Sequence, residues 1–475
     1  MVRSMIWLLK HLIQTMMMLS RWLVFLISTL VFVACSSAKA SNKLILAPTR
    51  TPASLPSATK LPPSPLPNTA TVPPNTATPS PMPPTSTPTQ TATVGPPMGW
   101  LIPDSEIVFS PSAVDFNVLD YVFNAGGFLS SYRQYLMITD WTAGADIVSR
   151  VALENSINPR LLLALLEYQS GCVLGQVQNP DDFNTAMGAT KAKRLDLYGQ
   201  LVWAAHVLSE GYYGWRAGTL TEFSLIDGTI IQPHPALNAG TVAISYLFSN
   251  LYDREKYELA LDPIRGFPTL FFEMFGNPWE RALKVEPLIP PDIAQPRLTL
   301  PFGAGKAWAL TGGPHPAFES NGPWASLDFA PPTAVNGCYQ SEDWVLAMAD
   351  GLVVRSELGV VIQDLDGDGV EQTGWVLMYL HIEERHRVPL GTYLHAGDQV
   401  GHPSCEGGRA TGTHVHIARK YNGEWIPAAG SIPFDLDGWI AHDGESAYLG
   451  TLTRADEVVT AHQFGSFISR ISRDD

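Results

Sequence analysis

The chain has 475 residues and a formal net charge of −15. At roughly 100–200 residues per domain, this length predicts two to three domains. Residues 1–98 contain seven basic side chains and no acid, so residues 99–475 carry 23 basic and 45 acidic side chains. This acidic excess excludes a general phosphate-binding surface, and we expect no nucleic acid among the partners of the chain.

The first 34 residues have the pattern of an export signal. Three basic residues precede an apolar run over residues 22–34, which stops at Cys35. A basic start, an apolar stretch and small residues at the boundary are typical of a signal peptide. Residues 31–36 resemble the processing box of bacterial lipoproteins, although Phe32 stands where Leu is usual. We expect residues 1–34 to be a signal peptide and Cys35 to carry a lipid at the outer face of the cell membrane; the alternative is an uncleaved membrane anchor, and both predict export.

Residues 35–98 have the composition of a linker. Between Pro48 and Pro97, 16 of 50 residues are Pro and 12 are Thr. Such a segment buries too little apolar surface to offset its ordering entropy, and Pro favours extended geometry. At roughly 3 Å per residue it spans well over about 100 Å when extended. We predict a disordered spacer, with a glycosylated mucin-like stalk as the alternative.

Residues 99–286 are predicted to be mostly helical. Periodic apolar runs indicate four helices, at Ala145–Ala152, Arg160–Tyr168, Leu195–Leu208 and Thr241–Leu251. Asn158-Pro159 is a typical helix start, because Pro is favoured in the first turn. Residues 287–301 are again rich in Pro and are predicted to connect two domains.

Residues 302–430 are predicted to form an antiparallel β domain. Short runs rich in Val, Leu and Tyr alternate with Gly and Asp turns, at Trp344–Ala347, Leu352–Ser356, Val360–Asp364, Trp375–His381 and His414–Arg419. Cys338 and Cys405 lie in this region, and an exported chain can keep a disulfide, which favours a bridge between these two residues. Cys172 is predicted to be a buried free thiol.

The histidines of the β region suggest a metal centre. His414 and His416 open an alternating strand, so both imidazoles are expected on one face of the sheet. His381 ends another strand run, and His315 and Asp328 flank a loop rich in Gly, Pro and Asn. A catalytic zinc needs three protein ligands from His, Asp or Glu and one open position for water. The set of five residues therefore indicates a hydrolytic zinc site.

The same region resembles the lysostaphin/LytM-type zinc metallopeptidases, and within them the beta-lytic branch, which cuts peptide bridges in bacterial cell walls. The resemblance is carried, in order, by Trp308–His315, Ser326–Phe329, Val345–Val353, Gly397–Gly401 and Thr411–His416.

This resemblance implies that His315, Asp328 and His416 are zinc ligands. It also implies that His381 and His414 are the non-ligand histidines, which orient or deprotonate water and stabilise the developing oxyanion. Which of the two is the base stays open. The commoner family pattern has its first His where this chain has a Trp, four residues before Asp328, so His315 would reach the metal through the longer loop of the beta-lytic branch.

The segment Asn158–Gly171 resembles the active-site helix of lytic transglycosylases, in which a Glu precedes a Ser. The matching position here is Gln169, and an amide cannot exchange the proton that glycosidic cleavage needs. Glu167 is a poor substitute, because two residues turn the helix by about 200°. We expect residues 99–286 to bind glycan strands without cleaving them; a helical spacer, or activity through another acid, are the alternatives.

The loop Asp364–Glu371 places carboxylates at alternate positions, like the start of a calcium loop. The twelfth position of that pattern is Trp375, where an EF-hand needs a bidentate Glu. An acidic hairpin turn and a calcium (Ca2+) site both remain open.

Together these patterns predict a multidomain fold: a disordered linker, a mostly α-helical lysozyme-like domain, an antiparallel β-sheet peptidase domain and a C-terminal extension over residues 431–475. The expected function is that of a membrane-anchored lipoprotein, facing the cell wall, with a zinc (Zn2+) endopeptidase that hydrolyses stem or cross-bridge peptides of peptidoglycan. The rival is a non-catalytic peptidoglycan-binding or hydrolase-activating protein. The complete set of five site residues favours the enzyme.

Overall fold

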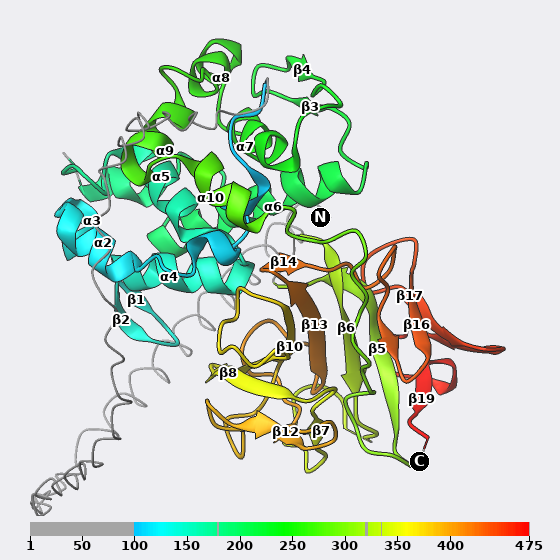
Figure 1. The fold of residues 1–475 in the computed structure, drawn as a ribbon. Helices are drawn as coiled ribbons and strands as arrows, with labels where there is room; N and C mark the ends of the chain where they lie inside the picture. The colour runs from blue at the N-terminus through cyan, green and yellow to red at the C-terminus, as the bar shows by residue number, and fades with distance from the viewer. Residues whose placement is uncertain (1–98, 178–179, 319–321, 334, 475) are drawn as a thin grey trace, which may run out of the picture. The chain divides into compact units, whose positions relative to one another are not determined.

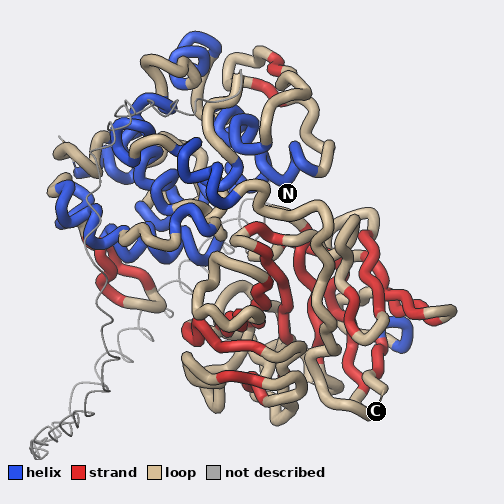
Figure 2. Tube along the Cα trace, in the orientation of Figure 1, coloured by secondary structure: helices blue, strands red, loops and turns tan. Residues whose placement is uncertain are grey.

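Helices and strands occupy different stretches of the chain (Figure 1 and Figure 2). The computed structural model describes residues 99–177, 180–318, 322–333 and 335–474. The predicted signal peptide, the lipid-carrying Cys35 and the disordered linker lie outside these residues. Within the described part of the chain, no helix has both the length and the apolar character needed to cross a membrane.

Helices predominate in the first half of the described chain, and the four predicted helices correspond to α4, α5, α6 and α7. The α-helices are α2 (Val118–Ala125), α3 (Phe128–Ser131), α4 (Gly144–Asn155), α5 (Pro159–Ser170), α6 (Leu197–Arg216), α7 (Ala239–Ser249), α8 (Arg254–Ala260), α9 (Phe267–Phe275) and α10 (Pro278–Val285). The shorter elements are the 3-10 helices η1 (Asp104–Glu106), η2 (Pro111–Ala113) and η3 (Pro180–Thr185), with the hairpins β1 (Arg133–Leu136)–β2 (Asp140–Ala143) and β3 (Phe223–Ser224)–β4 (Ile230–Ile231).

Helix α5 runs through the centre of the helical core, and its ends follow from its sequence. The Asn158 side chain caps the N-terminus by accepting a hydrogen bond from the Arg160 amide, and Pro159 occupies the first turn. Gly171 ends the helix in the left-handed conformation, with φ 62°. The six residues 161–166 between these ends are all buried, so α5 is surrounded by its neighbours.

Strands make up the C-terminal half of the described chain. They are β5 (Ala307–Pro316), β6 (Trp324–Ala330), β7 (Val345–Leu346), β8 (Gly351–Glu357), β9 (Val360–Asp364), β10 (Trp375–Leu380), β11 (Tyr393–Leu394), β12 (Gln399–Gly401), β13 (Val415–Tyr421), β14 (Glu424–Trp425), β15 (Asp435–Leu436), β16 (Trp439–Asp443), β17 (Gly450–Arg454), β18 (Glu457–Thr460) and β19 (Arg470–Ser472); the 3-10 helix η4 (Phe467–Ser469) precedes β19.

The main sheet is antiparallel and carries a hydrophobic core on each face. Its strand order is β11-β8-β9-β10-β13-β6-β5-β19, with β14 paired to β13. Successive residues of β10 point to opposite faces: Leu377 and Tyr379 join one core, while Val376 and Met378 join the other. The expected antiparallel β architecture is therefore present.

Residues 435–472 extend this β architecture. Strands β15, β16, β17 and β18 form a four-stranded sheet of their own, and β19 pairs with β5 at the edge of the main sheet. The backbone of Tyr448, before β17, exchanges hydrogen bonds with Gly313 and Pro314 of β5. The C-terminal segment is thus attached to the strand that carries His315.

The three cysteines in the described residues are arranged as the sequence predicts. Cys338 and Cys405 form a disulfide, and Cys172 is a buried free thiol.

A buried ion cluster joins strands β8 and β13 of the main sheet to the loop between β9 and β10. Glu371 accepts hydrogen bonds from Arg355 at 2.9 and 3.0 Å and from Lys420 at 2.6 Å. Burial alone would raise the pKa of Glu371, but the two cations lower it to about 2. The stabilisation is therefore complete above the ordinary carboxyl pKa and is lost as the pH falls toward 2.

Replacing Glu371 with Ala should lower the free energy of unfolding by about 3–5 kcal/mol, because two buried cations lose their partner. Urea unfolding at neutral pH measures this loss. The matched control is Glu445→Ala, an exposed carboxylate, whose effect should stay within about 0.5 kcal/mol. An unchanged unfolding midpoint in Glu371→Ala would contradict this role for the cluster.

Candidate metal centre

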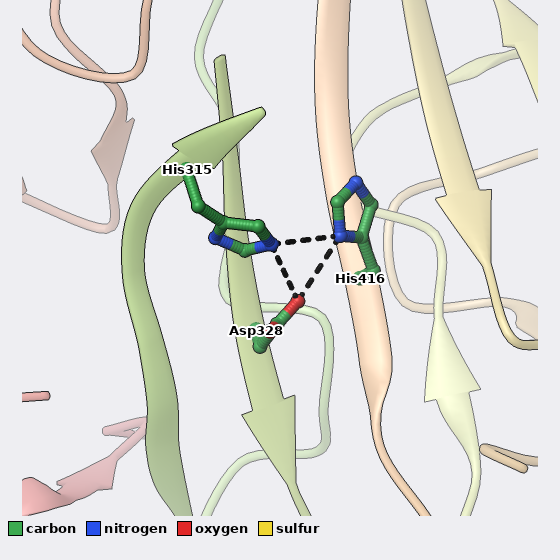
Figure 3. Close-up of side chains that lie close together, drawn as sticks. All are labelled: His315, Asp328 and His416. Atoms are coloured by element: carbon green, nitrogen blue, oxygen red, sulfur yellow. Dashed lines mark hydrogen bonds and ion pairs between the residues drawn. The ribbon is translucent and has the colours of Figure 1, made fainter. Parts of the chain in front are cut away.

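Three side chains from neighbouring strands converge on one point (Figure 3). His315 comes from β5, Asp328 from β6 and His416 from β13. The Nε2 atom of His315 lies 3.0 Å from Nδ1 of His416 and 3.3 Å from Oδ1 of Asp328, and the His416–Asp328 separation is 3.1 Å. All three residues are buried. They are the residues that the sequence suggests as zinc ligands.

The strand register explains this convergence. Asp328 is directly opposite His416 on β13 and opposite Gly312 on β5, so its side chain shares a face with that of His416. His315 is opposite Ser326 instead, but β5 shifts its register between Gly312 and His315. Such irregularities bend a strand and redirect its side chains, which here brings the His315 ring toward Asp328.

Backbone carbonyls fix the tautomers of the two imidazoles. Nδ1 of His315 lies 2.7 Å from the Gly313 carbonyl oxygen, and Nε2 of His416 lies 2.9 Å from that of Ala317. A carbonyl oxygen only accepts, so these nitrogens carry the proton of each neutral ring. The other nitrogens therefore present lone pairs toward the Asp328 carboxylate.

Three lone-pair donors that face one another without a shared proton fit a cation. The protonation states agree with this: burial lowers the pKa of His416, which favours the neutral ring. Burial would raise the pKa of Asp328, but His315 and His414 hold it well below its ordinary value. Metal ligands must be deprotonated, so an ionised Asp328 carboxylate and two imidazole nitrogens that carry no proton in these tautomers suit a zinc ion.

The two remaining histidines lie beside this set. The His414 Nε2 atom is 3.6 Å from Oδ1 of Asp328, and the rings of His381 and His414 are 4.5 Å apart. Nδ1 of His414 lies 2.8 Å from the Gly412 carbonyl oxygen, and Nδ1 of His381 lies 2.7 Å from that of Glu406. Both residues therefore direct Nε2 away from their carbonyl partners. Burial lowers the pKa of His381 to about 3, with smaller contributions from His414 and His416, so this ring is neutral.

Strand β13 begins at Val415, one residue later than the sequence suggests, so His414 lies just before it. An isolated bridge to Ser404 holds His414 in place. The structure thus brings together all five residues, His315, Asp328, His381, His414 and His416, that the sequence selects from regions far apart in the chain.

Sequence reasoning missed Tyr448. Its ring stacks on the His315 ring with centroids 4.1 Å apart and planes 22° from parallel. Burial raises the pKa of its phenol, and the Asp328 charge adds to this effect, which places the phenol within electrostatic range of the metal set. No motif marks this residue, because it lies in the C-terminal segment to which the sequence assigns no function.

The acidic loop brings together carboxylate oxygens of Asp364, Asp366 and Asp368 within 4.8 Å of one another. Each of these side chains also accepts hydrogen bonds from loop backbone amides, as Asp364 does from Gly369 at 2.9 Å. Glu371, at the end of the loop, is bound to Arg355 and Lys420. The hairpin thus has its polar groups partnered within the protein, while the three oxygens remain close together.

Comparisons with known proteins match both halves of the described chain. Residues 100–290 match the family model described as LasA, N-terminal domain. Protease LasA of Pseudomonas aeruginosa is 25% identical over 300 residues, which cover 58% of this chain and 66% of that protein. The beta-lytic metalloendopeptidase of Lysobacter enzymogenes is 27% identical over 135 residues, covering 28% of this chain and 74% of that protein.

Among solved structures, the M23 metalloprotease pseudoalterin from the deep sea aligns with 35% of this chain and 96% of its own, at 23% identity and a TM-score of 0.30. The match to protease LasA spans slightly less than two thirds of the length of that protein.

Gly312 leaves room for the metal set, and this can be tested. A Cβ at position 312 would lie 2.5 Å from Oδ2 of Asp328, so Gly312→Ala should displace the carboxylate and weaken zinc binding by more than about tenfold. Zinc content after dialysis against a buffered zinc solution measures this. The control is Gly303→Ala, where the nearest atoms are 3.8 Å away. Equal zinc content in both variants would show that the carboxylate does not need this space.

Proposed function

We propose that this chain, whose C-terminal domain belongs to the lysostaphin/LytM-type zinc metallopeptidase family, is an exported enzyme that hydrolyses peptide bonds of peptidoglycan. The observation that carries the proposal is the buried set of His315, Asp328 and His416, whose unprotonated ligand atoms lie 3.0–3.3 Å apart. The names of the relatives, a protease and a metalloendopeptidase, support the reaction class.

His315, Asp328 and His416 would hold the zinc ion. When bound, zinc polarises a peptide carbonyl and lowers the pKa of water toward about 7. The chain itself supplies the fixed geometry: the carbonyls of Gly313 and Ala317 orient the two imidazoles, and burial excludes competing solvent.

His381 and His414 would handle the protons of the reaction. Each ring has its Nδ1 proton fixed by a carbonyl, so each offers a lone pair at Nε2 that accepts a hydrogen bond from water. Because burial lowers the pKa of His381 to about 3, this ring is the weaker proton acceptor as long as its surroundings stay unchanged. After protonation, the same nitrogen donates to the amine that leaves or to the developing oxyanion. The geometry supports both residues in these roles and leaves the choice of base open.

For the helical domain we propose glycan binding without glycosidic cleavage. The Gln169 carbonyl oxygen accepts a hydrogen bond from the Tyr252 hydroxyl at 2.9 Å, and an amide has no acidic proton to give. Glu167 accepts hydrogen bonds from the backbone amides of Val173 and Leu174, so its carboxylate binds the turn that follows α5. Both observations support a domain without a catalytic acid at this helix.

We further propose that the chain is a lipoprotein anchored through Cys35 at the outer face of the cell membrane and facing the cell wall. Its substrates would be stem or cross-bridge peptides. Calcium at the Asp364–Glu371 loop stays a prediction, and the proximity of the three Asp carboxylates supports it. A non-catalytic binding or activating protein is the rival function, and incubation of the purified full-length protein with peptidoglycan, with and without chelator, separates the two by the peptide fragments released.

Paired variants separate the metal ligands from the proton-transfer residues. His416→Ala should lose stoichiometric zinc, because three-ligand sites rarely survive with two. His414→Ala should keep zinc and lose about 10²–10⁴-fold in kcat, the range for a general acid–base group. Metal analysis and fragment release are measured on the same preparations. One zinc per chain in His416→Ala would refute the ligand assignment, and full turnover in His414→Ala would refute the catalytic one.

The helical domain has its own test. Glycan strands exposed to the full-length protein should bind it and show no anhydro-sugar ends, because Gln169 cannot act as the acid. Mass spectrometry of the glycan ends measures cleavage, and a chelator removes the peptidase activity so that only the helical domain is assayed. Anhydromuramyl products under these conditions would show that another residue supplies the proton.

A further inference from the structure

A second pair of histidines lies outside the five-residue site, next to Trp344. His386 Nδ1 and His402 Nε2 are 3.3 Å apart. His402 is buried, with 2% of its surface exposed, whereas His386 is exposed to solvent. The pair therefore combines one fixed imidazole with one that solvent species can reach.

The tautomer of His402 is fixed by its surroundings. Its Nδ1 atom lies 2.8 Å from the backbone carbonyl oxygen of Asp343. The carbonyl only accepts, so Nδ1 carries the proton and Nε2 presents its lone pair toward His386. The same arrangement orients His315 and His416, and it is the usual one for a histidine that binds a metal.

The separation of the two nitrogens matches a shared metal ion. Two nitrogens bound at about 2.1 Å and about 109° to one zinc lie about 3.4 Å from each other. The value of 3.3 Å for His386 and His402 agrees with this, and so do the 3.0 to 3.3 Å separations within the first set. A hydrogen bond between the two rings has the same length, and measured zinc binding distinguishes the two arrangements.

The backbone around the pair is fixed. The Glu383 amide donates to the His402 carbonyl at 2.9 Å, and the Val388 amide donates to Val400 at 2.9 Å, so the turn carrying His386 is paired to the strand before His402. His386 itself has φ 61°, a conformation that costs energy in a residue with a side chain. The Trp344 ring packs against His402, with centroids 4.0 Å apart.

We propose that His386 and His402 form a second transition-metal site. Imidazole ligands suit Zn2+, Cu2+ and Ni2+, and the remaining positions would be filled by water on the exposed side. On binding, the proton that His386 shares with His402 moves to the Nε2 atom of His386, and both facing lone pairs bind the metal. With two protein ligands, this site binds more weakly than the three-ligand set and is independent of it.

The test uses the full-length protein and zinc alone. Equilibrium dialysis over a series of buffered zinc concentrations, followed by metal analysis, should give one more zinc per chain in the wild type than in His386→Ala. In His386→Ala, the affinity for the additional zinc that the wild type binds should fall by more than about tenfold. His395→Ala is the matched control, because His395 is also exposed but lies beside the Asp350 carboxylate rather than a second imidazole, and this variant should keep the wild-type count.

Two further measurements strengthen the assignment. His402→Phe, which keeps a ring against Trp344, should lose the same zinc; if this buried variant fails to fold, exposed His386→Ala still decides the question. Added Cu2+ should quench more of the total tryptophan fluorescence in the wild type than in His386→Ala, because Trp344 packs against His402. Equal zinc stoichiometry and affinity in the wild type and His386→Ala would overturn the proposal and leave the pair as a hydrogen bond.

Discussion

The metal centre of the β domain depends on the convergence of two imidazole nitrogens and one carboxylate with no proton between them. Such a group is repulsive without a cation, so it persists only where the surrounding backbone holds it. The carbonyls of Gly313 and Ala317 fix the ring protons, the pairing of β6 with β13 aligns Asp328 with His416, and Gly312 provides the space. The register shift in β5, the glycine at position 312 and two backbone carbonyls thus all contribute to the same arrangement of ligand atoms.

The same physical device recurs within the domain. Each of the four histidines in the five-residue site has one ring nitrogen held by a backbone carbonyl, as does His402. Backbone carbonyls are well suited to this task, because the sheet fixes their positions and they never change protonation state. A sheet of short strands with frequent turns offers many such carbonyls near its edges, which explains how several oriented imidazoles occur in a domain of modest size.

Sequence reasoning located all five residues of the set because they lie in recognisable local patterns, such as the alternation of His414 and His416. It also located the helices around α5, where capping residues and apolar periodicity agree. It could not find Tyr448 or the pairing of β19 with β5, because both depend on contacts between segments more than a hundred residues apart that no local pattern encodes. The His386–His402 pair escaped for a different reason: the two residues are 16 positions apart, neither stands in a motif, and their proximity arises from the backbone pairing of the turn at His386 with the segment before His402.

The disulfide between Cys338 and Cys405 has a consequence for where the protein can mature. Cys405 precedes Glu406, whose carbonyl orients His381, and the loop of Cys338 is hydrogen-bonded to Thr413, next to His414. The two histidines that we propose for proton transfer, His381 and His414, are therefore anchored through one covalent link. In a reducing compartment this link is absent, and the loops that position both rings are held by hydrogen bonds alone. A chain synthesised in the cytoplasm would complete the covalent anchoring of these two loops only after reaching an oxidising environment.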